Sequence, residues 1–214
     1  MKQMKSRASS IGCIAAVIPI LSILFMPPWV LADDGDNGHN AALYSIAADT
    51  WKCYAADLDP NTNLPMDNLT WAGGGPVSSK GQYTSASNIG VYLWAVVAAN
   101  DLNLISRSTA DSLVSATLDE VATIDRYQGL LYQWYDTTNG HRIRNPNDID
   151  CAAEPTPVKD NCYFLSAVDN GWYASGLIVV RQALPELRRQ VDALLQPMNF
   201  GLFTTAGISI PGAM

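Results

Sequence analysis

The sequence predicts an all-α fold in which helical hairpins form an αα-toroid, with inner helices covered by outer ones. Two segments, 85–100 and 172–183, are apolar on nearly every face, so each should be a helix that is buried on all sides. Helices with a single apolar stripe alternate with them along the chain. Long loops rich in Gly, Pro and aromatic residues precede the two apolar helices, and these loops should meet at one end and form a cleft. A plain helical bundle gives a similar pattern but needs fewer fully apolar helices.

The first 32 residues have the features of a secretory signal peptide. Three basic residues precede an apolar run over 11–31, and a small-residue signal predicts cleavage after Ala32, followed by a flexible lead-in over 33–40. An uncleaved anchor is the alternative. Because prolines within the run make it a poor spanning helix, we expect no stable membrane insertion after cleavage, and a secreted, extracellular or periplasmic protein.

Composition limits the classes of function that the chain can have. The 214 residues are 48% hydrophobic, enough for one domain with a real core. A net charge of −7 argues against nucleic acid as a partner, because phosphates require Lys and Arg. No spacing of His or Cys indicates a metal site, and we expect no cofactor.

Three cysteines remain after the predicted cleavage. Cys151 and Cys162 bracket a short Pro-rich loop, and in an oxidising compartment they are the natural disulfide. Cys53 lies in an apolar helical pattern and is expected to be a buried free thiol.

The remaining helices follow from apolar spacing and capping residues. The first, over 41–57, has a stripe of residues at intervals of three and four, namely Tyr44, Ala47, Trp51, Tyr54 and Leu58. A long loop is expected over 58–85. The third helix should begin at a Ser108 cap and keep one wet face, and the last should begin at Pro185.

The segment from Asp160 to Glu186 begins as a polar, aromatic loop and becomes the second apolar helix. Ser166 and Asp169 have capping-box spacing at the start of this helix. Asp169, Asn170 and Trp172 cluster there, at the mouth of a helix expected to be buried, so this segment is a candidate ligand site.

Three ordered motifs resemble those of one family. Residues 84–93 (Thr-Ser-Ala-Ser-Asn-Ile-Gly-Val-Tyr-Leu) are similar to the Thr-Ser-Pro-Thr-(Asn/Glu)-Ile-Gly motif of the glucoamylase-like (glycoamylase) family, although Ala86 replaces the usual Pro. Residues 129–140 resemble its Gly-Phe-(Phe/Tyr)-Tyr-x-Trp-Tyr-Asp segment, and 166–171 its Ser-(Thr/Ser)-(Ile/Val)-Asp segment. The resemblance implies an (α/α)6 toroid with glycoside hydrolase activity on glucans, including β-1,2-glucan in some relatives. Because the family domain is longer than this chain, residues 41–214 are expected to be an incomplete toroid, truncated at its C-terminus.

Glycosidases use two carboxylates, about 5–5.5 Å apart for retention and about 6.5–9.5 Å apart for inversion. The candidates are Asp136, Asp169 and Asp160. Asp136 lies beside two aromatic residues that could raise its pKa, but it could also simply start a turn. Asp169 could simply cap its helix, and the second catalytic acid could lie in the missing half.

Further residues are candidates for sugar binding. Indole and phenol rings could stack on sugar rings or pack in the core, and amides at helix starts could donate to sugar hydroxyls or cap. The candidates are Trp71, Asn88, Trp134, Tyr135, Asn170 and Trp172. The predicted function is therefore a secreted glycoside hydrolase-like domain that acts on a polysaccharide or oligosaccharide, incomplete or inactive as this chain. The alternative is a carbohydrate-binding or non-catalytic helical protein. Bare flanks of the inner helices predict poor solubility or oligomerisation.

Overall fold

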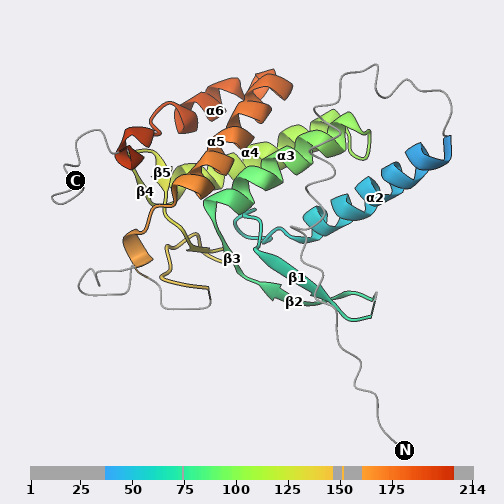
Figure 1. Cartoon of the computed structure of the whole chain (residues 1–214), viewed down its shortest axis with the longest axis horizontal. Coiled ribbons are helices and arrows are strands. Elements are labelled where there is room, and N and C mark those ends of the chain that lie inside the picture. Colours follow the sequence, from blue (N-terminus) through green and yellow to red (C-terminus); the bar gives the residue numbers. More distant parts are fainter. Residues whose placement is uncertain (1–36, 74, 147–150, 152–160, 205–214) are drawn as a thin grey trace, which may run out of the picture.

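The structure is a computed structural model that describes residues 37–73, 75–146, 151 and 161–204 (Figure 1). The predicted signal peptide at 1–32 lies outside the described residues, as does part of the lead-in. The described chain is mostly helical with short strands, as the predicted all-α class requires. None of its helices is long and apolar enough to cross a membrane.

The described residues form five α-helices, which are connected by short strands and 3-10 helices. The helices are α2 (Asn37–Ala56), α3 (Ala86–Asp101), α4 (Arg107–Thr123), α5 (Ala167–Ala183) and α6 (Arg188–Leu195). The strands are β1 (Asn68–Trp71), β2 (Val77–Gly81), β3 (Tyr83–Thr84), β4 (Arg126–Tyr127), β5 (Leu130–Leu131) and β6 (Tyr135–Asp136). The 3-10 helices are η4 (Asn161–Tyr163), η5 (Pro185–Leu187) and η6 (Phe200–Phe203). The strands form three antiparallel pairs, β1 with β2, β3 with β6 and β4 with β5.

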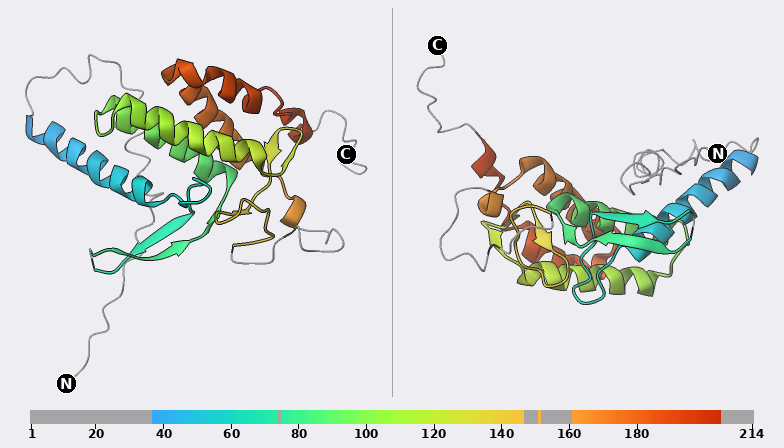
Figure 2. Two further views of the ribbon diagram at one scale, coloured as in Figure 1. Left: turned by 180° about the vertical axis from the view of Figure 1, so that it is seen from behind. Right: turned by 90° about the horizontal axis from the view of Figure 1, so that it is seen from below.

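The two inner helices, α3 and α5, lie side by side and run in the same direction (Figures 1 and 2). Ser85 caps α3, and no residue from Ala86 to Asn100 is exposed, which confirms the predicted buried helix. Gly90 of α3 and Gly176 of α5 meet where the helices cross, and a Cβ on Gly176 would lie 2.8 Å from the Cα of Gly90. The two backbones can approach this closely because neither residue has a side chain.

Two helices are less covered than the sequence predicts. One flank of α5 is open, with Val168, Trp172 and Ile178 exposed, so the prediction that this helix is buried on all sides is wrong for that flank. In α2, Tyr54 is buried as expected, but every residue from Asn40 to Ile46 is exposed, including Tyr44 of the predicted stripe. The N-terminal half of α2 extends away from the other helices (Figures 1 and 2).

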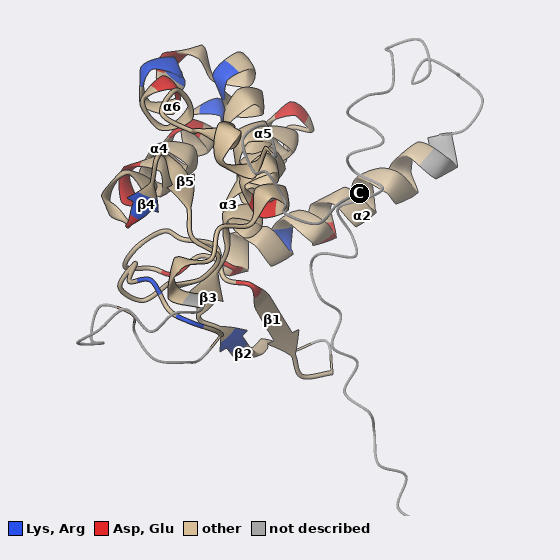
Figure 3. Ribbon diagram, turned by 60° about the vertical axis from the view of Figure 1, so that its left-hand side comes forward, with Lys and Arg blue, Asp and Glu red and all other residues tan. Residues whose placement is uncertain are grey.

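Among the described helices, α4 and α6 carry most of the charged residues (Figure 3). In α4, Val114, Leu118 and Val121 are fully buried while Asp119 is exposed, which confirms the single wet face. Its N-terminal cap is Ser106, not Ser108, because the hydroxyl of Ser106 accepts from the Thr109 amide at 3.1 Å.

Two further expectations are corrected. The segment 58–85 is not an irregular loop: it contains the β1–β2 hairpin and the strand β3.

The predicted Cys151–Cys162 disulfide is present, with 5.8 Å between the Cα atoms. Cys53 is disulfide-bonded as well, so the prediction of a free thiol is wrong.

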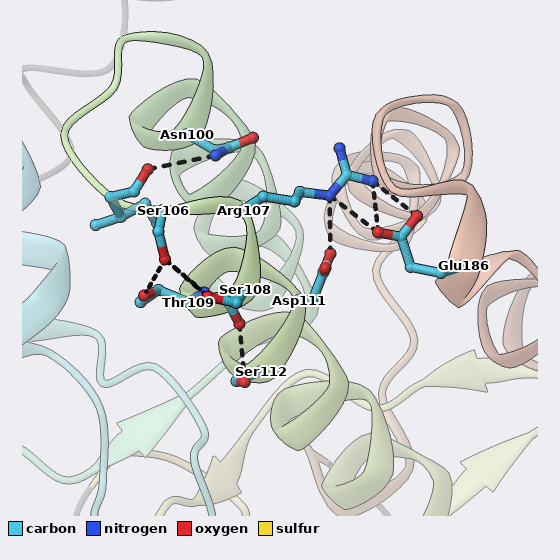
Figure 4. Close-up of polar contacts among 9 residues, drawn as sticks. Asn100, Ser106, Arg107, Ser108, Thr109, Asp111, Ser112 and Glu186 are labelled. Atoms are coloured by element: carbon cyan, nitrogen blue, oxygen red, sulfur yellow. Dashed lines mark hydrogen bonds and ion pairs between the residues drawn. The ribbon is translucent and has the colours of Figure 1, made fainter.

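The C-terminal end of α3 and the start of α4 form a compact corner with η5 (Figure 4). The Arg107 guanidinium donates to both carboxylate oxygens of Glu186 at 2.7 Å, and its Nε donates to Asp111 at 3.1 Å. These contacts connect the short-loop ends of the helices and leave the opposite end to the longer loops.

Candidate functional site

The N-terminal ends of α3 and α5 lie at the same end of the domain, where β3 pairs with β6 (Figure 1). The register places Tyr83 opposite Asp136 and Thr84 opposite Tyr135. Because β3 leads directly into α3, this pairing brings the segment around Trp134 beside the start of the inner helix. A site at the end of the toroid, as the loops predicted, would therefore lie where β3 pairs with β6.

One carboxylate at this end is held by two amides. Asp67 Oδ1 accepts from Asn88 Nδ2 at 3.0 Å, and Oδ2 accepts from Asn68 Nδ2 at 3.2 Å. The same Asn68 amide donates to the Tyr83 hydroxyl at 2.9 Å, and the ring of Tyr83 packs edge-on against Trp134 with 5.6 Å between centroids. We call these five residues the Asp67 cluster. It unites two predicted binding residues, Asn88 and Trp134, around a carboxylate that the sequence analysis did not select.

Capping fixes the Asn88 side chain. Its Oδ1 accepts from the Ser85 hydroxyl at 2.9 Å, and its backbone N–H donates to Ser85 Oγ at 3.3 Å. With Oδ1 held at the cap, Nδ2 is directed to Asp67. Asn88 therefore takes part in the helix cap, which was one of the two roles that the sequence left open for it. It also orients the Asp67 carboxylate.

A second carboxylate, Asp57, lies behind the cluster. It is only 5% exposed, and its Oδ1 has no hydrogen-bond partner among the residues that the structure describes. Burial raises the pKa of Asp57 to about 7, the charge of Asp67 adds to this increase, and Lys80 opposes it. Near neutral pH the site thus contains a carboxyl group that retains its proton readily, next to the amide-bound Asp67. Pairs of acids in different environments are the arrangement in which one can donate a proton.

Buried tyrosines border this acid. Burial first, and the charge of Asp57 second, raise the pKa values of Tyr54 and Tyr92 well above that of a free tyrosine. In the described part of the chain, the buried Tyr92 hydroxyl has no hydrogen-bond partner. Two desolvated polar groups, the Asp57 acid and the Tyr92 phenol, thus lie within electrostatic range of each other, and Asp57 lies within that range of Asp67.

The predicted catalytic acids have different surroundings. Asp136 is half-buried in β6, and its Oδ1 accepts from the Thr138 amide at 2.7 Å and the Thr138 hydroxyl at 2.6 Å, the contacts of a residue that starts a turn. Asp169 is half-buried in the first turn of α5, where its amide donates to Ser166 Oγ at 3.2 Å. Asp160 lies outside the described residues.

Two predicted sugar ligands are structural instead. Tyr135 is fully buried, and its hydroxyl accepts from the Tyr132 amide at 2.7 Å and donates to the Asp125 carbonyl at 2.6 Å. Asn170 is also fully buried: its Oδ1 accepts from the Leu131 amide at 2.8 Å and its Nδ2 donates to the Leu131 carbonyl at 2.9 Å. Their polar atoms are already used by the backbone, so neither is free to bind sugar in this structure.

The other predicted aromatic ligands lie away from these contacts. Trp71 is half-buried at the end of β1. Trp172 lies on the open flank of α5 and packs edge-on against Trp94, with 5.6 Å between centroids. Neither makes a ring contact with the Asp67 cluster among the described residues.

Sequence reasoning missed Asp57, Asp67, Asn68 and Tyr83, all within or next to the segment interpreted as an irregular loop. A usable signal was present, because three acids at 57, 59 and 67 precede the cap of the first apolar helix. Across the described ranges, no group of three His, Cys, Asp or Glu residues is placed to hold a metal ion.

Comparison with known proteins gives the fold a wider context. The structure superposes on a candidate glucoamylase from Bacteroides fragilis NCTC 9343 with a TM-score of 0.59 and 16% identity, covering 96% of this chain and 41% of that one. An endo-β-1,2-glucanase from Chitinophaga pinensis, in complex with sophorotriose and glucose, gives a TM-score of 0.54 at 15% identity, with 73% of this chain and 34% of that one covered. A curated cyclic β-(1,2)-glucan synthase, NdvB of Rhizobium meliloti (strain 1021), is 27% identical over 164 residues, which are 76% of this chain and 5% of the synthase.

The fold is thus that of the glucoamylase-like class of helical toroids, as the three motifs predicted, and the chain spans less than half the length of these relatives. Residues 45–205 match a family model described as a protein of unknown function, DUF3131. The chain belongs to this DUF3131 family.

Proposed function

We propose that this protein is a secreted glucan-active domain of the glycoside hydrolase type, which binds a glucan at the end of the toroid where α3 and α5 begin. The Asp67 cluster is the observation that carries the proposal. A half-buried carboxylate held by two amides, beside Trp134 and Tyr83, combines the acceptor that sugar hydroxyls require with an aromatic surface for a sugar ring. The names of the relatives, which include a β-1,2-glucanase and a cyclic β-(1,2)-glucan synthase, favour β-1,2-glucan as the first substrate to test.

The chemistry available to the site is that of a pair of acids. Asp57, with a pKa raised to about 7 by burial, is the group best suited to hold a proton near neutral pH. Asp67 is linked to the aromatic surface through the Asn68 amide, which donates to both Asp67 and the Tyr83 hydroxyl. Asp136 and Asp169 remain further candidates for direct contact with sugar. The disulfide bond supports export, because disulfides persist in oxidising compartments.

The alternative is a domain that binds glucan without cleaving it. One observation favours it: Asp136, which the sequence suggested as an acid, has its Oδ1 engaged by the turn at Thr138. Binding would still require the Asp67 cluster but no paired acid.

The proposal is tested with the purified chain on β-1,2-glucan, by calorimetric binding and by release of reducing ends. We expect binding that Asp67→Asn weakens at least about tenfold, the loss of about 1.4 kcal/mol expected for a hydrogen bond to a charged group. Glu186→Gln is the matched control, since it makes the same chemical change at the opposite end of α5 and should bind as the wild type does. Release of reducing ends supports hydrolysis, whereas binding without release supports the alternative. If neither binding nor release is detected, the carbohydrate proposal is rejected.

A further inference from the structure

Trp134, the indole of the Asp67 cluster, lies between two other segments of the chain that hold its backbone. Its carbonyl accepts from the Ile143 amide at 3.1 Å, in the segment that follows β6. The amide of Gln133, the residue before it, donates to the Phe164 carbonyl at 3.1 Å, in the segment that leads into α5. The position of the indole therefore depends on where these two segments lie.

The Cys151–Cys162 disulfide connects the same two segments. The Cys151 amide donates to the Arg142 carbonyl at 2.8 Å, which ties this cysteine to the segment after β6. Cys162 lies in η4, two residues before Phe164. One covalent bond thus joins the two stretches of backbone that hold the indole from either side.

The Arg142 side chain strengthens this connection. Its Cζ lies 4.4 Å from the centre of the Tyr132 ring and 4.6 Å from the centre of the Tyr163 ring. Tyr163 directly follows Cys162, so the guanidinium of one segment stacks on a ring of the other beside the disulfide. The Arg142 side chain is only 13% exposed, and cation–π contacts are strongest where water is excluded. The stack requires Tyr163 to stay in place, and the adjacent disulfide secures this.

The helices do not depend on this bond for their packing. The hydrophobic core formed by the described residues, which unites α3, α4 and α5, includes neither cysteine. Removal of the disulfide therefore leaves the helical core intact, while the two connected segments gain conformational freedom. The effect should be confined to the end of the domain that carries Trp134.

We infer that the Cys151–Cys162 disulfide completes the glucan site, because the Trp134 indole is fixed in the Asp67 cluster only after the bond has formed. The inference rests on the proposed function. Formation of the bond is a thiol–disulfide exchange with an oxidant that itself contains a disulfide, such as glutathione disulfide or a disulfide-bonded protein. The two cysteine thiols give up two electrons and two protons and become one disulfide, while the disulfide of the oxidant accepts them and becomes two thiols.

Burial of the bond gives this step a direction. Cys151 is 8% exposed and Cys162 is 4% exposed, so external thiols have little access to the bond once the chain has folded around it. Cytosolic thiols are kept reduced, and disulfides form in exported proteins. A chain that has not been exported therefore binds glucan weakly, and the exported chain acquires its site and retains it.

The test compares the wild type, refolded in reduced glutathione or with glutathione disulfide, with the double variant Cys151→Ser/Cys162→Ser. Calorimetric titration with β-1,2-glucan measures the affinity of each. We expect the reduced wild type and the double variant to bind at least about tenfold more weakly than the oxidised wild type, the loss that follows when only one tenth of the molecules is competent to bind. The double variant is measured in the oxidising buffer, where Cys53 keeps its own disulfide. Binding by this variant as tight as that of the oxidised wild type overturns the inference.

Amide hydrogen exchange tests the same contacts without a ligand. The amides of Gln133 and Ile143 should exchange at least about tenfold faster in the double variant, because their acceptors are no longer held in place. The amide of Leu118, on the buried face of α4, is the matched control and should be unchanged. Unchanged exchange at Gln133 and Ile143 overturns the inference. If their exchange is faster but the oxidised wild type binds no glucan, the proposed function is rejected, and the role of the disulfide is limited to holding Trp134.

Discussion

The crossing of α3 and α5 gives the sharpest test of the fold. We predict that Gly176→Ala destabilises the protein, although alanine is the better helix former. A Cβ at this position would lie 2.8 Å from the Cα of Gly90, within the backbone of the neighbouring helix, so the two helices must separate to admit it. Backbone atoms cannot relieve this clash by a change of rotamer, as the atoms of a flexible side chain can.

The magnitude follows from two opposing terms. Overpacking of a tight core costs about 1–3 kcal/mol, and the upper part of this range applies because the obstacle is backbone. The higher helix propensity of Ala raises the free energy of unfolding by about 1 kcal/mol. The net loss is about 2 kcal/mol, which corresponds to a fall in Tm of roughly 4–8 °C for a domain of this size.

Gly171→Ala is the matched control in the same helix, because a Cβ at Gly171 has no atom within 4 Å. This variant should gain up to about 1 kcal/mol from helix propensity alone. Thermal melting followed by circular dichroism, together with urea titration, compares the two variants with the wild type. If Gly176→Ala is as stable as Gly171→Ala, the inner helices do not cross at Gly90, and the packing described for them is refuted.

Three further predictions concern single polar groups. Because burial raises the pKa of Asp57 to about 7, its contribution to stability is complete below its unfolded pKa and is lost as the pH rises to about 7. Asp57→Asn should therefore gain stability over the wild type at pH 8 but not at pH 4, on the order of 1.4 kcal/mol per unit of pKa shift, as measured by urea titration at both pH values. Tyr135→Phe leaves the Tyr132 amide and the Asp125 carbonyl without their partner, and should cost about 1–3 kcal/mol in the same titration. Glu186→Gln should lower the Tm only slightly, and the difference should vanish in about 1 M salt, because its ion pair with Arg107 is exposed to solvent.

Local patterns predicted the inner helices better than their surroundings. Helix α3 follows from its continuous apolar composition and the Ser85 cap, both properties of neighbouring residues. The open flank of α5 has the same composition, but composition does not say whether another element lies beside it. The hairpin β1–β2 was missed because its strands are only four and five residues long, too short for a clear alternation.

The candidate site was predicted only in part, because contacts between residues distant in the sequence decide which side chains are buried. Trp134 and Tyr135 are adjacent in the sequence, but Tyr135 begins β6 and is fully buried, whereas Trp134 precedes the strand and is half-buried. Tyr135 takes the buried face, a choice that depends on the distant Asp125 carbonyl. Asn170 likewise binds the backbone of Leu131, 39 residues away, a partner that helix-capping rules do not reveal. Asp67 became visible only when β1 and β3 placed it against Asn88.

The two ends of the inner helices differ in how well their polar groups are satisfied, and this difference favours the β3–β6 end for function. At the opposite end, the Arg107 side chain finds carboxylate partners on Asp111 and Glu186. At the β3–β6 end, Asp57 Oδ1 and Thr137 Oγ1 are buried without a partner among the described residues. A buried polar atom without a partner costs about 1–3 kcal/mol, a cost that a ligand or a bound water molecule can remove. Unsatisfied atoms also occur on the inner helices, at Tyr92, Trp94 and Tyr173, so the oxygens of Asp57 and Thr137 support a site for a polar ligand only together with the amide-held Asp67 carboxylate at the same end.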